Sequence, residues 1–283
     1  HVKRIKPQEL FNAPLTSEQY TEQLRIYEGF TSYYDDLSLL RCKVIEQPEY
    51  LKIVGQNLTR LLHNKGRLKQ SITQSSFDAW TKFYKQDESA INNIVSYYNK
   101  GAVVAMCLDL LIRHKSQSKS SLQDVMQQLW QQHGRVNIPT DIDVIHQITQ
   151  QKLNLDLSDF LHQALYTTNE LPVQELLNNF GIKLIQGYRE NLDDKGGEQH
   201  KSTINIEFGA QVKSRDLGVD IIQVSEGTAA HRAGMMVGDI LIALNNWQVS
   251  KERLKPLLNN LSDGQNVELC LLRDKKLKSL NLI

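Results

Sequence analysis

The stretch LRIYEGFTSYYDD, residues 24–36, decides how the first part of the chain is organised. Its apolar residues recur at three- and four-residue steps, which predicts a well-buried amphipathic helix. Within this helix Glu28 lies between Ile26 and Phe30, an unusual place for a lone acid. Because removing an unpaired charge from water is expensive, such a carboxylate either finds a partner or is held neutral. We expect the partner to be a metal ion.

The same helical period continues on both sides of this stretch. Thr16 and Gln19 form a T-x-x-Q capping box, so we expect the helix to begin at Thr16. Residues 67–92 are polar with aromatic anchors, which predicts irregular structure with short helical turns around Phe77, Trp80, Phe83 and Tyr84. The predicted helices run from Thr16 to about Cys42, from Pro48 to about Asn64, from Val95 to about His114, and then from caps at Ser120, Thr140, and Asp156 or Ser158.

The spacing of apolar residues changes toward the end of the chain, from a helical to an alternating pattern. Pro172 begins a short helix that stops at Gly181, Ile182–Ile185 has the pattern of a strand, and residues 187–202 have the composition of a surface loop. After Thr203 short Val-, Ile- and Leu-rich strands alternate with two helical pieces, Thr228–Ala233 and Ser250–Asn259. We therefore predict an α+β multidomain protein with a helical lobe (1–170), a connector of helix, strand and loop (171–202) and a small β-rich domain (203–283).

The composition excludes several classes of function. The 33 Lys and Arg residues are balanced by 32 Asp and Glu residues, so we expect no positive electrostatic field that attracts nucleic acid. Gly-rich phosphate-binding loops are absent from the sequence. The longest apolar run, residues 102–108, is far shorter than the ~20 residues of a membrane span. Three widely separated cysteines are typical of buried, unpaired thiols and favour a cytoplasmic over a periplasmic location. The sequence leaves the oligomeric state open.

Six motifs occur in an order that carries a resemblance to a known family. They are VKRIKP (2–7), IYEGFTSYYDD (26–36), SFDAW (76–80), VSYYNKGA (95–102), ELP (170–172) and EGTAAHRAGMMVGDILIALNN (226–246). In this order they resemble the glycyl aminopeptidases, gluzincin zinc metallopeptidases that end in a PDZ domain of the bacterial type. The resemblance implies a thermolysin-like helical lobe and hydrolysis of N-terminal Gly or Ala from peptides by a zinc-activated water.

The resemblance also implies roles for particular residues. Glu28 matches the third zinc ligand of gluzincins, and Tyr98 in the sequence YNKGA matches the tyrosine that donates a hydrogen bond to the tetrahedral intermediate. Tyr97 competes with Tyr98, since either ring can face the cleft. The plainer interpretation of Glu28 is a surface or cap-pairing carboxylate, and the plainer interpretation of Tyr98 is a core tyrosine. We expect Gly101 and Ala102 to serve close helix packing.

Half of the expected zinc site does not occur in this sequence. There is no HExxH motif, and none of the eight histidines forms an HxxxH pair. Since one Glu does not hold zinc tightly, we expect this fragment to be metal-free and inactive, and zinc to be the cofactor of the intact protein. The alternative is a non-catalytic helical scaffold whose PDZ domain recruits partners.

The last domain is expected to bind peptides or the ends of protein chains. In a PDZ domain a backbone loop captures a C-terminal carboxylate, and the peptide adds a strand to the sheet. Phe208, Gly209 and Ala210 match that loop, and Gln211 opens the strand offered to the ligand. Leu254, Leu257 and Leu258 are the candidate residues that line the peptide groove. The competing interpretation is that Phe208 and these leucines fill the core of the domain. Trp80, Trp130 and Trp247 are predicted to be core or interface anchors.

Overall fold

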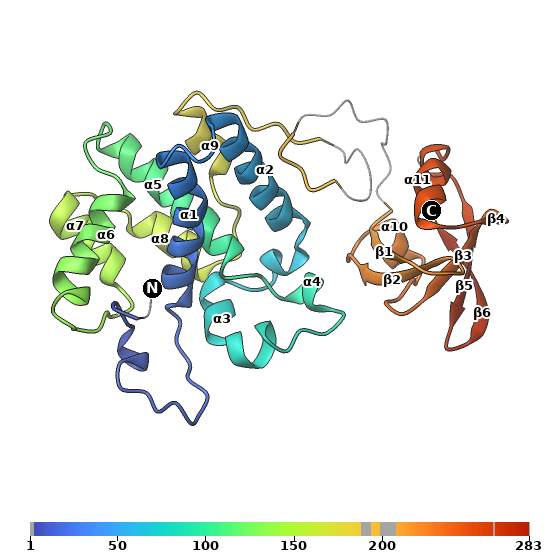
Figure 1. The fold of residues 1–283 in the computed structure, drawn as a ribbon, viewed down its shortest axis with the longest axis horizontal. Coiled ribbons are helices and arrows are strands. Elements are labelled where there is room, and N and C mark those ends of the chain that lie inside the picture. Colours follow the sequence, from blue (N-terminus) through green and yellow to red (C-terminus); the bar gives the residue numbers. More distant parts are fainter. Residues whose placement is uncertain (1–2, 188–193, 199–207, 263, 283) are drawn as a thin grey trace. The chain divides into compact units, whose positions relative to one another are not determined.

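The computed structural model describes residues 3–187, 194–198, 208–262 and 264–282 (Figure 1). They form two compact units. The helical unit consists of the residues up to Gln86 together with Asn93–Leu184. The sheet unit consists of Asp87–Asn92 and the described residues from Ile185 onward. The predicted change from helices to a β-rich domain is confirmed, and the chain has the predicted α+β multidomain architecture.

The helices before the sheet include two long ones, α1 and α5, that lie side by side in the core of the helical unit (Figure 1). In chain order the elements are η1 (Gln8–Leu10), α1 (Leu24–Arg41), α2 (Gln47–His63), η2 (Lys65–Leu68), α3 (Ile72–Phe77), the π-helical turn η3 (Ala79–Phe83), α4 (Ala90–Asn93), α5 (Asn99–Lys115), α6 (Leu122–Leu129), the π-helical turn η4 (Trp130–Gly134), α7 (Val144–Leu153), α8 (Ser158–Tyr166) and α9 (Val173–Asn178).

Helix α1 begins later than its sequence predicts. It starts at Leu24 rather than Thr16, because the Gln19 side chain donates to the Pro14 carbonyl at 3.1 Å and to Ser17 instead of closing a capping box. The first turn is capped from another part of the chain, since the backbone N–H of Arg25 donates to Ser76 Oγ at 2.9 Å. The SFDAW motif therefore supplies the cap that the local sequence lacks.

Other predicted boundaries shift for similar local reasons. Helix α2 has Pro48 in its first turn, as predicted. Helix α6 has its capping box at Ser121 and Asp124, one residue later than predicted. The predicted cap of α7, Thr140, is fully buried and bonds elsewhere. The expected strand at 182–185 is wrong, because Gly181 takes a φ of +74° and the Ile182 N–H closes the end of α9 on the Leu177 carbonyl at 3.1 Å.

The sheet unit is built on one antiparallel sheet. Its strand order is β1 (Ala210–Ser214), β2 (Val219–Val224), β3 (Ile240–Leu244), β5 (Val267–Arg273) and β6 (Lys276–Leu282), with β4 (Trp247–Gln248) also paired to β3. The helices α10 (Ala229–Arg232) and α11 (Lys251–Asn259) match the two predicted helical pieces. Most of the predicted strand TINIEF lies outside the described residues. Along β2 and β5 buried positions recur at every second residue over part of each strand, as expected for a sheet with one buried face.

Several large aromatic side chains are more exposed than predicted. Trp80, Trp130 and Trp247 are 45%, 47% and 62% exposed, so they are not core anchors, and the alternative prediction of interface anchors stays a prediction. Phe77 and Tyr84 are likewise exposed, whereas Phe83 packs against the core. Cys42 is also exposed, although Cys107 is buried as predicted. Among the described helices, none has the length and apolar character that crossing a bilayer requires.

Candidate functional site

The candidate site begins where α1 and α5 cross. The backbones meet at Gly29 and Gly101, and a Cβ added to Gly29 would lie 2.7 Å from the Gly101 Cα. Real Cβ atoms do not approach backbone so closely, so no larger residue fits at this crossing without moving a helix. The expectation that the glycine of YNKGA serves close packing is confirmed. The crossing fixes the neighbours of both glycines relative to each other.

Glu28 directly precedes Gly29 on α1, and Tyr98 precedes Gly101 by three residues on the α5 side. Glu28 is half-buried on α1, and burial raises the pKa of its carboxyl group. Tyr98, also half-buried, occupies the N-cap position of α5. Burial, a hydrogen bond with Tyr84 and the nearby charge of Glu28 together raise the pKa of Tyr98 to about 12. The structure thus brings together an acid and a neutral hydroxyl that are 70 positions apart in the sequence.

Tyr98 belongs to a cluster of four aromatic rings. Tyr97 stacks on Tyr98 with ring centroids 4.6 Å apart, and Phe83 lies 4.9 Å from Tyr97 and 5.9 Å from Tyr98. The Tyr84 hydroxyl is 3.1 Å from that of Tyr98 and accepts from that of Tyr97 at 3.3 Å. Tyr97 is 1% exposed, so its ring belongs to the core. Of the two candidate tyrosines, Tyr98 is therefore the more accessible.

Sequence reasoning did not find Tyr84. It follows the π-helical turn η3, which inserts an extra residue into the helical ladder and sets the direction of the chain at this point. No spacing or motif in the polar stretch 67–92 distinguishes Tyr84 from its aromatic neighbours. Its position opposite Tyr98 appears only once η3 and α5 are packed together.

The N-terminal end of α1 is held by a buried threonine. Thr140 bonds to the Tyr27 hydroxyl and lies 3.1 Å from Gln23 Oε1, while its backbone N–H donates to the Lys6 carbonyl at 2.8 Å. The VKRIKP segment and α1 are therefore tied to the same residue. This contact sets the axis of the helix that carries Glu28.

The described residues supply one candidate metal ligand at this site. No group of three His, Cys, Asp or Glu side chains that could hold a metal ion occurs among the residues that the structure describes. The chemistry of Glu28 fits a zinc site, because a half-buried carboxylate is one of the side chains that ligate zinc. The remaining ligands of such a site would have to come from residues other than these.

The sheet unit offers a separate candidate site along β1. Among the described strands β1 lies at the edge of the sheet and pairs only with β2, and Gln211, Lys213 and Ser214 on it are exposed. Gly209 precedes it with a φ of +82°, and its carbonyl accepts from the Ser225 N–H at 2.9 Å. Helix α11 packs against β1. An edge strand beside a helix and a glycine loop can accept an added strand.

The predicted groove residues separate into two groups. Phe208, Leu254 and Leu258 are at most 4% exposed and pack in the core of the sheet unit. Ala210 is buried too, whereas Gly209 and Leu257 are half-buried and Gln211 is exposed. Gly209, Gln211 and Leu257 are therefore the predicted groove residues that are accessible enough to contact a peptide.

The helical unit that carries Glu28 and Tyr98 is followed by an antiparallel sheet with two short helices. Family models match both of these parts of the chain. Residues 1–104 match the M61 glycyl aminopeptidase family, and residues 207–283 match the PDZ domain. The chain therefore carries a domain of the glycyl aminopeptidase type at its N-terminal end and a PDZ domain at its C-terminal end.

A solved structure resembles nearly the whole chain. The aminopeptidase N family protein from Idiomarina loihiensis is 38% identical, with a TM-score of 0.96 over 99% of this chain. The chain spans 48% of the length of that protein. A serine endoprotease from Yersinia pestis is 23% identical over 29% of each chain, with a TM-score of 0.26. A search of curated proteins found no match.

Proposed function

We propose that this chain belongs to a zinc-dependent aminopeptidase that releases N-terminal Gly or Ala from peptides. In this proposal Glu28 is the third zinc ligand and Tyr98 is the donor to the oxyanion. The observation that carries the proposal is the close crossing of α1 and α5 at Gly29 and Gly101, which places Glu28 near enough to Tyr98 for its charge to act on the Tyr98 hydroxyl. The match of residues 1–104 to the glycyl aminopeptidases supports the same assignment.

The chemistry follows from the charges that the two side chains carry. Bound zinc would supply an activated water and polarise the scissile carbonyl. Tyr98, whose pKa is about 12, keeps its proton at neutral pH and can therefore donate a hydrogen bond to the negative oxygen that develops in the transition state. The Tyr84 hydroxyl, 3.1 Å away, orients that of Tyr98. Glu28 contributes negative charge that favours a bound cation over an empty site.

The test uses the complete reading frame that contains this chain. Its product is assayed for release of glycine from glycyl-p-nitroanilide, with and without a chelator. Tyr98→Phe removes one hydroxyl and is expected to lower kcat about 10²–10³-fold, as loss of one oxyanion donor does. Tyr97→Phe is the matched control, since it removes a hydroxyl from the buried ring beside it.

The proposal fails if Tyr98→Phe and Tyr97→Phe have equal effects, or if the chelator leaves the activity intact. Glu28→Gln is expected to lower the zinc content of the purified protein, which metal analysis measures without any reference to activity. An upstream reading frame that lacks HExxH would instead favour the non-catalytic scaffold.

For the sheet unit we propose binding of peptides or chain ends along β1. Among the described strands β1 pairs only with β2, and this edge position and the Gly209 turn support the proposal. The expected contacts are the backbone of Gly209 to Gln211 and the side chain of Leu257. Fluorescence anisotropy with a library of labelled peptides that end in a free or an amidated carboxyl group tests it. Equal binding of the two forms would exclude recognition of a terminal carboxylate.

A further inference from the structure

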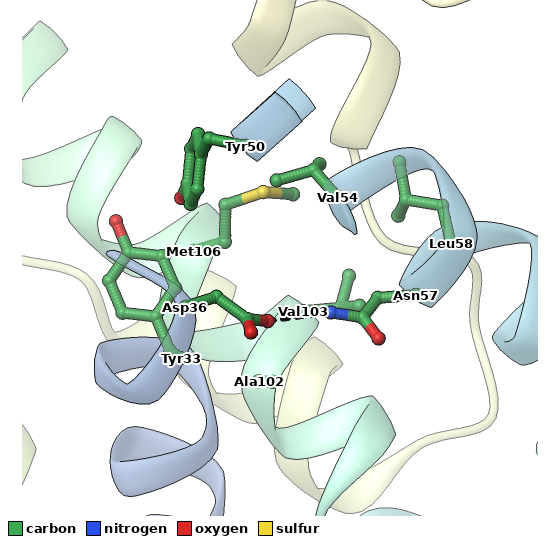
Figure 2. A pocket seen from close by; sticks show the side chains of 9 residues that line it. All are labelled: Tyr33, Asp36, Tyr50, Val54, Asn57, Leu58, Ala102, Val103 and Met106. Carbon is green, nitrogen blue, oxygen red and sulfur yellow. Dashed lines mark hydrogen bonds between the residues drawn. The ribbon is translucent and has the colours of Figure 1, made fainter. Parts of the chain in front are cut away.

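The helical unit has a hollow between α1, α2 and α5, but the space in it is little larger than one water molecule (Figure 2). Two of the polar side chains that line it bond to each other, since Asn57 donates to Asp36 Oδ2 at 3.0 Å. The hollow is therefore too small for a side chain or a peptide.

In the PDZ domain, residues 207–283, the positive charge is concentrated on β1 and α11. These two elements together contain four cationic residues and one acidic residue, Glu252. The other positions of the domain contain six Lys and Arg residues against eight Asp and Glu residues. The excess of positive charge therefore comes entirely from β1 and α11. We call their four cationic residues the basic surface: Lys213 of β1, and Lys251, Arg253 and Lys255 of α11.

The arginines outside the basic surface bond to groups of the same domain. Arg273, for example, donates to both carboxylate oxygens of the buried Asp239 at 2.7 Å. In the part of the chain that the structure describes, no acidic side chain forms an ion pair with Lys213 or Lys255. The positive charge of these two lysines is therefore available to a ligand.

Strand β1 can present charge to an added strand on both of its faces. Side chains of a strand alternate between two faces, and Val212 packs against the core cluster that also contains Leu254 of α11. Helix α11 therefore lies over this face of β1, in agreement with the packing of the two elements. Lys213, the next residue, is exposed on the opposite face. A peptide strand beside β1 has one set of side chains on the side of α11, where Lys255 is half-buried, and the other set on the side of Lys213.

The edge position and the charges together favour one kind of ligand. The unpaired N–H and C=O groups of an edge strand match the backbone of a polypeptide, which a nucleic acid does not have. Side chains directly opposite each other on neighbouring strands lie about 5 Å apart, so an acid on the added strand comes within reach of a lysine ammonium. One exposed ion pair changes an affinity about 1.5- to 5-fold, so several such pairs favour an acidic peptide by about tenfold.

We propose that the basic surface recognises acidic peptides, as extended segments that add to β1 and carry Asp or Glu side chains near their C-terminal end. The proposal rests on the peptide binding proposed above for the sheet unit, because the added strand brings the acids to the lysines. It gives the domain a preference among peptides that the backbone contacts of Gly209 to Gln211 do not provide.

The binding test compares two labelled peptides of equal length with a free C-terminal carboxyl group, one with Glu and one with Gln at the same positions. Fluorescence anisotropy with the whole chain is expected to give a Kd about tenfold lower for the Glu peptide at low ionic strength. The difference is expected to disappear at about 1 M NaCl, where the Debye length is about 3 Å.

Two double variants locate the charge that is responsible. Lys213→Gln with Lys255→Gln removes two charges from the basic surface and is expected to remove most of the preference for the Glu peptide. Lys276→Gln with Lys278→Gln is the matched control, because it removes the same charge from exposed positions on β6, at the other end of the strand order. This control is expected to keep the preference, and urea titration compares the stability of the two double variants.

The outcomes separate this inference from the proposed function. Equal affinities for the Glu and Gln peptides, or equal losses in the two double variants, overturn the acidic preference and leave peptide binding along β1 in place. The absence of binding by either peptide overturns both. Equally tight binding of single-stranded DNA of the same charge shows unselective attraction of polyanions and overturns the recognition of a polypeptide.

Discussion

The helical unit and the sheet unit prepare their candidate sites in different ways. In the helical unit Glu28 and Tyr98 come from helices that meet through two glycines, so the site depends on side chains brought together by long-range packing. In the sheet unit the accessible residues are Gly209 and Gln211, at the start of a strand that pairs only with β2 among the described strands. Damage to core packing should therefore misplace the first site, whereas the second should tolerate many side-chain changes.

The largest expected effect tests the sheet unit. Leu254→Ala empties a position that is 0% exposed, and deletion of a buried leucine typically costs about 2–5 kcal/mol. Leu257→Ala removes a half-buried side chain of the same helix and is expected to cost less stability and to lower peptide affinity. Hydrogen exchange of β5 and peptide anisotropy give the two readouts. If Leu257→Ala unfolds the unit as strongly as Leu254→Ala, our division of the groove leucines is wrong.

The glycine loop provides the next comparison within the same unit. Gly209 and Gly227 both have a positive φ, so alanine at either position costs about 1–2 kcal/mol of backbone strain. At Gly209 the new Cβ would also lie 2.1 Å from the Thr228 side chain, whereas at Gly227 it would meet nothing. Overpacking adds about 1–3 kcal/mol, so Gly209→Ala is expected to lower the free energy of unfolding further than Gly227→Ala. Urea titration of both variants measures the difference, and equal losses would mean that Thr228 moves aside freely.

The third prediction tests the crossing in the helical unit. Gly29→Ala is expected to lower the stability of this unit by about 1–3 kcal/mol, although alanine alone favours a helix by about 1 kcal/mol. The reason is that the Cβ meets the Gly101 backbone, which cannot rotate away. Gly187→Ala lies outside the helical unit, adds a Cβ that meets nothing, and is expected to leave the midpoint of the helical unit unchanged. An unchanged unfolding midpoint for Gly29→Ala, measured by circular dichroism, would show that the helices separate easily and that the site is not fixed by this contact.

The sequence predicted elements better than it predicted their ends. The apolar period of LRIYEGFTSYYDD and the proline of α2 depend on nearby residues, and both predictions agree with the structure. The start of α1 depends on Ser76, 51 positions from Arg25, so no local pattern reveals it. Thr140 is a residue type that commonly caps helices, yet in the structure it forms hydrogen bonds with Lys6 and Tyr27 instead.

The candidate site shows the same division. The resemblance singled out Glu28 and Tyr98, and the structure brings them together. It gave no sign of Tyr84, which matters only through a contact made after folding. The groove leucines share one apolar stripe on α11, and periodicity alone does not separate a side chain that faces the core from one at its margin.

The smallest expected effect concerns Lys100, which is 3% exposed beside the Arg67–Glu170 ion pair. Burial lowers the pKa of Lys100 below its usual 10.5, so the unfolded chain binds this proton more tightly than the folded protein does. The free energy of unfolding therefore gains a contribution that rises with pH between the lowered pKa and 10.5. Lys100→Met is expected to remove that rise and to stabilise the helical unit near neutral pH, because the charge no longer has to be buried. Urea midpoints at a series of alkaline pH values measure the slope, with exposed Lys119→Met as the control. A slope that survives in Lys100→Met would assign the effect to another group, and a loss of stability near neutral pH would mean that Lys100 makes a net favourable contact with Glu170.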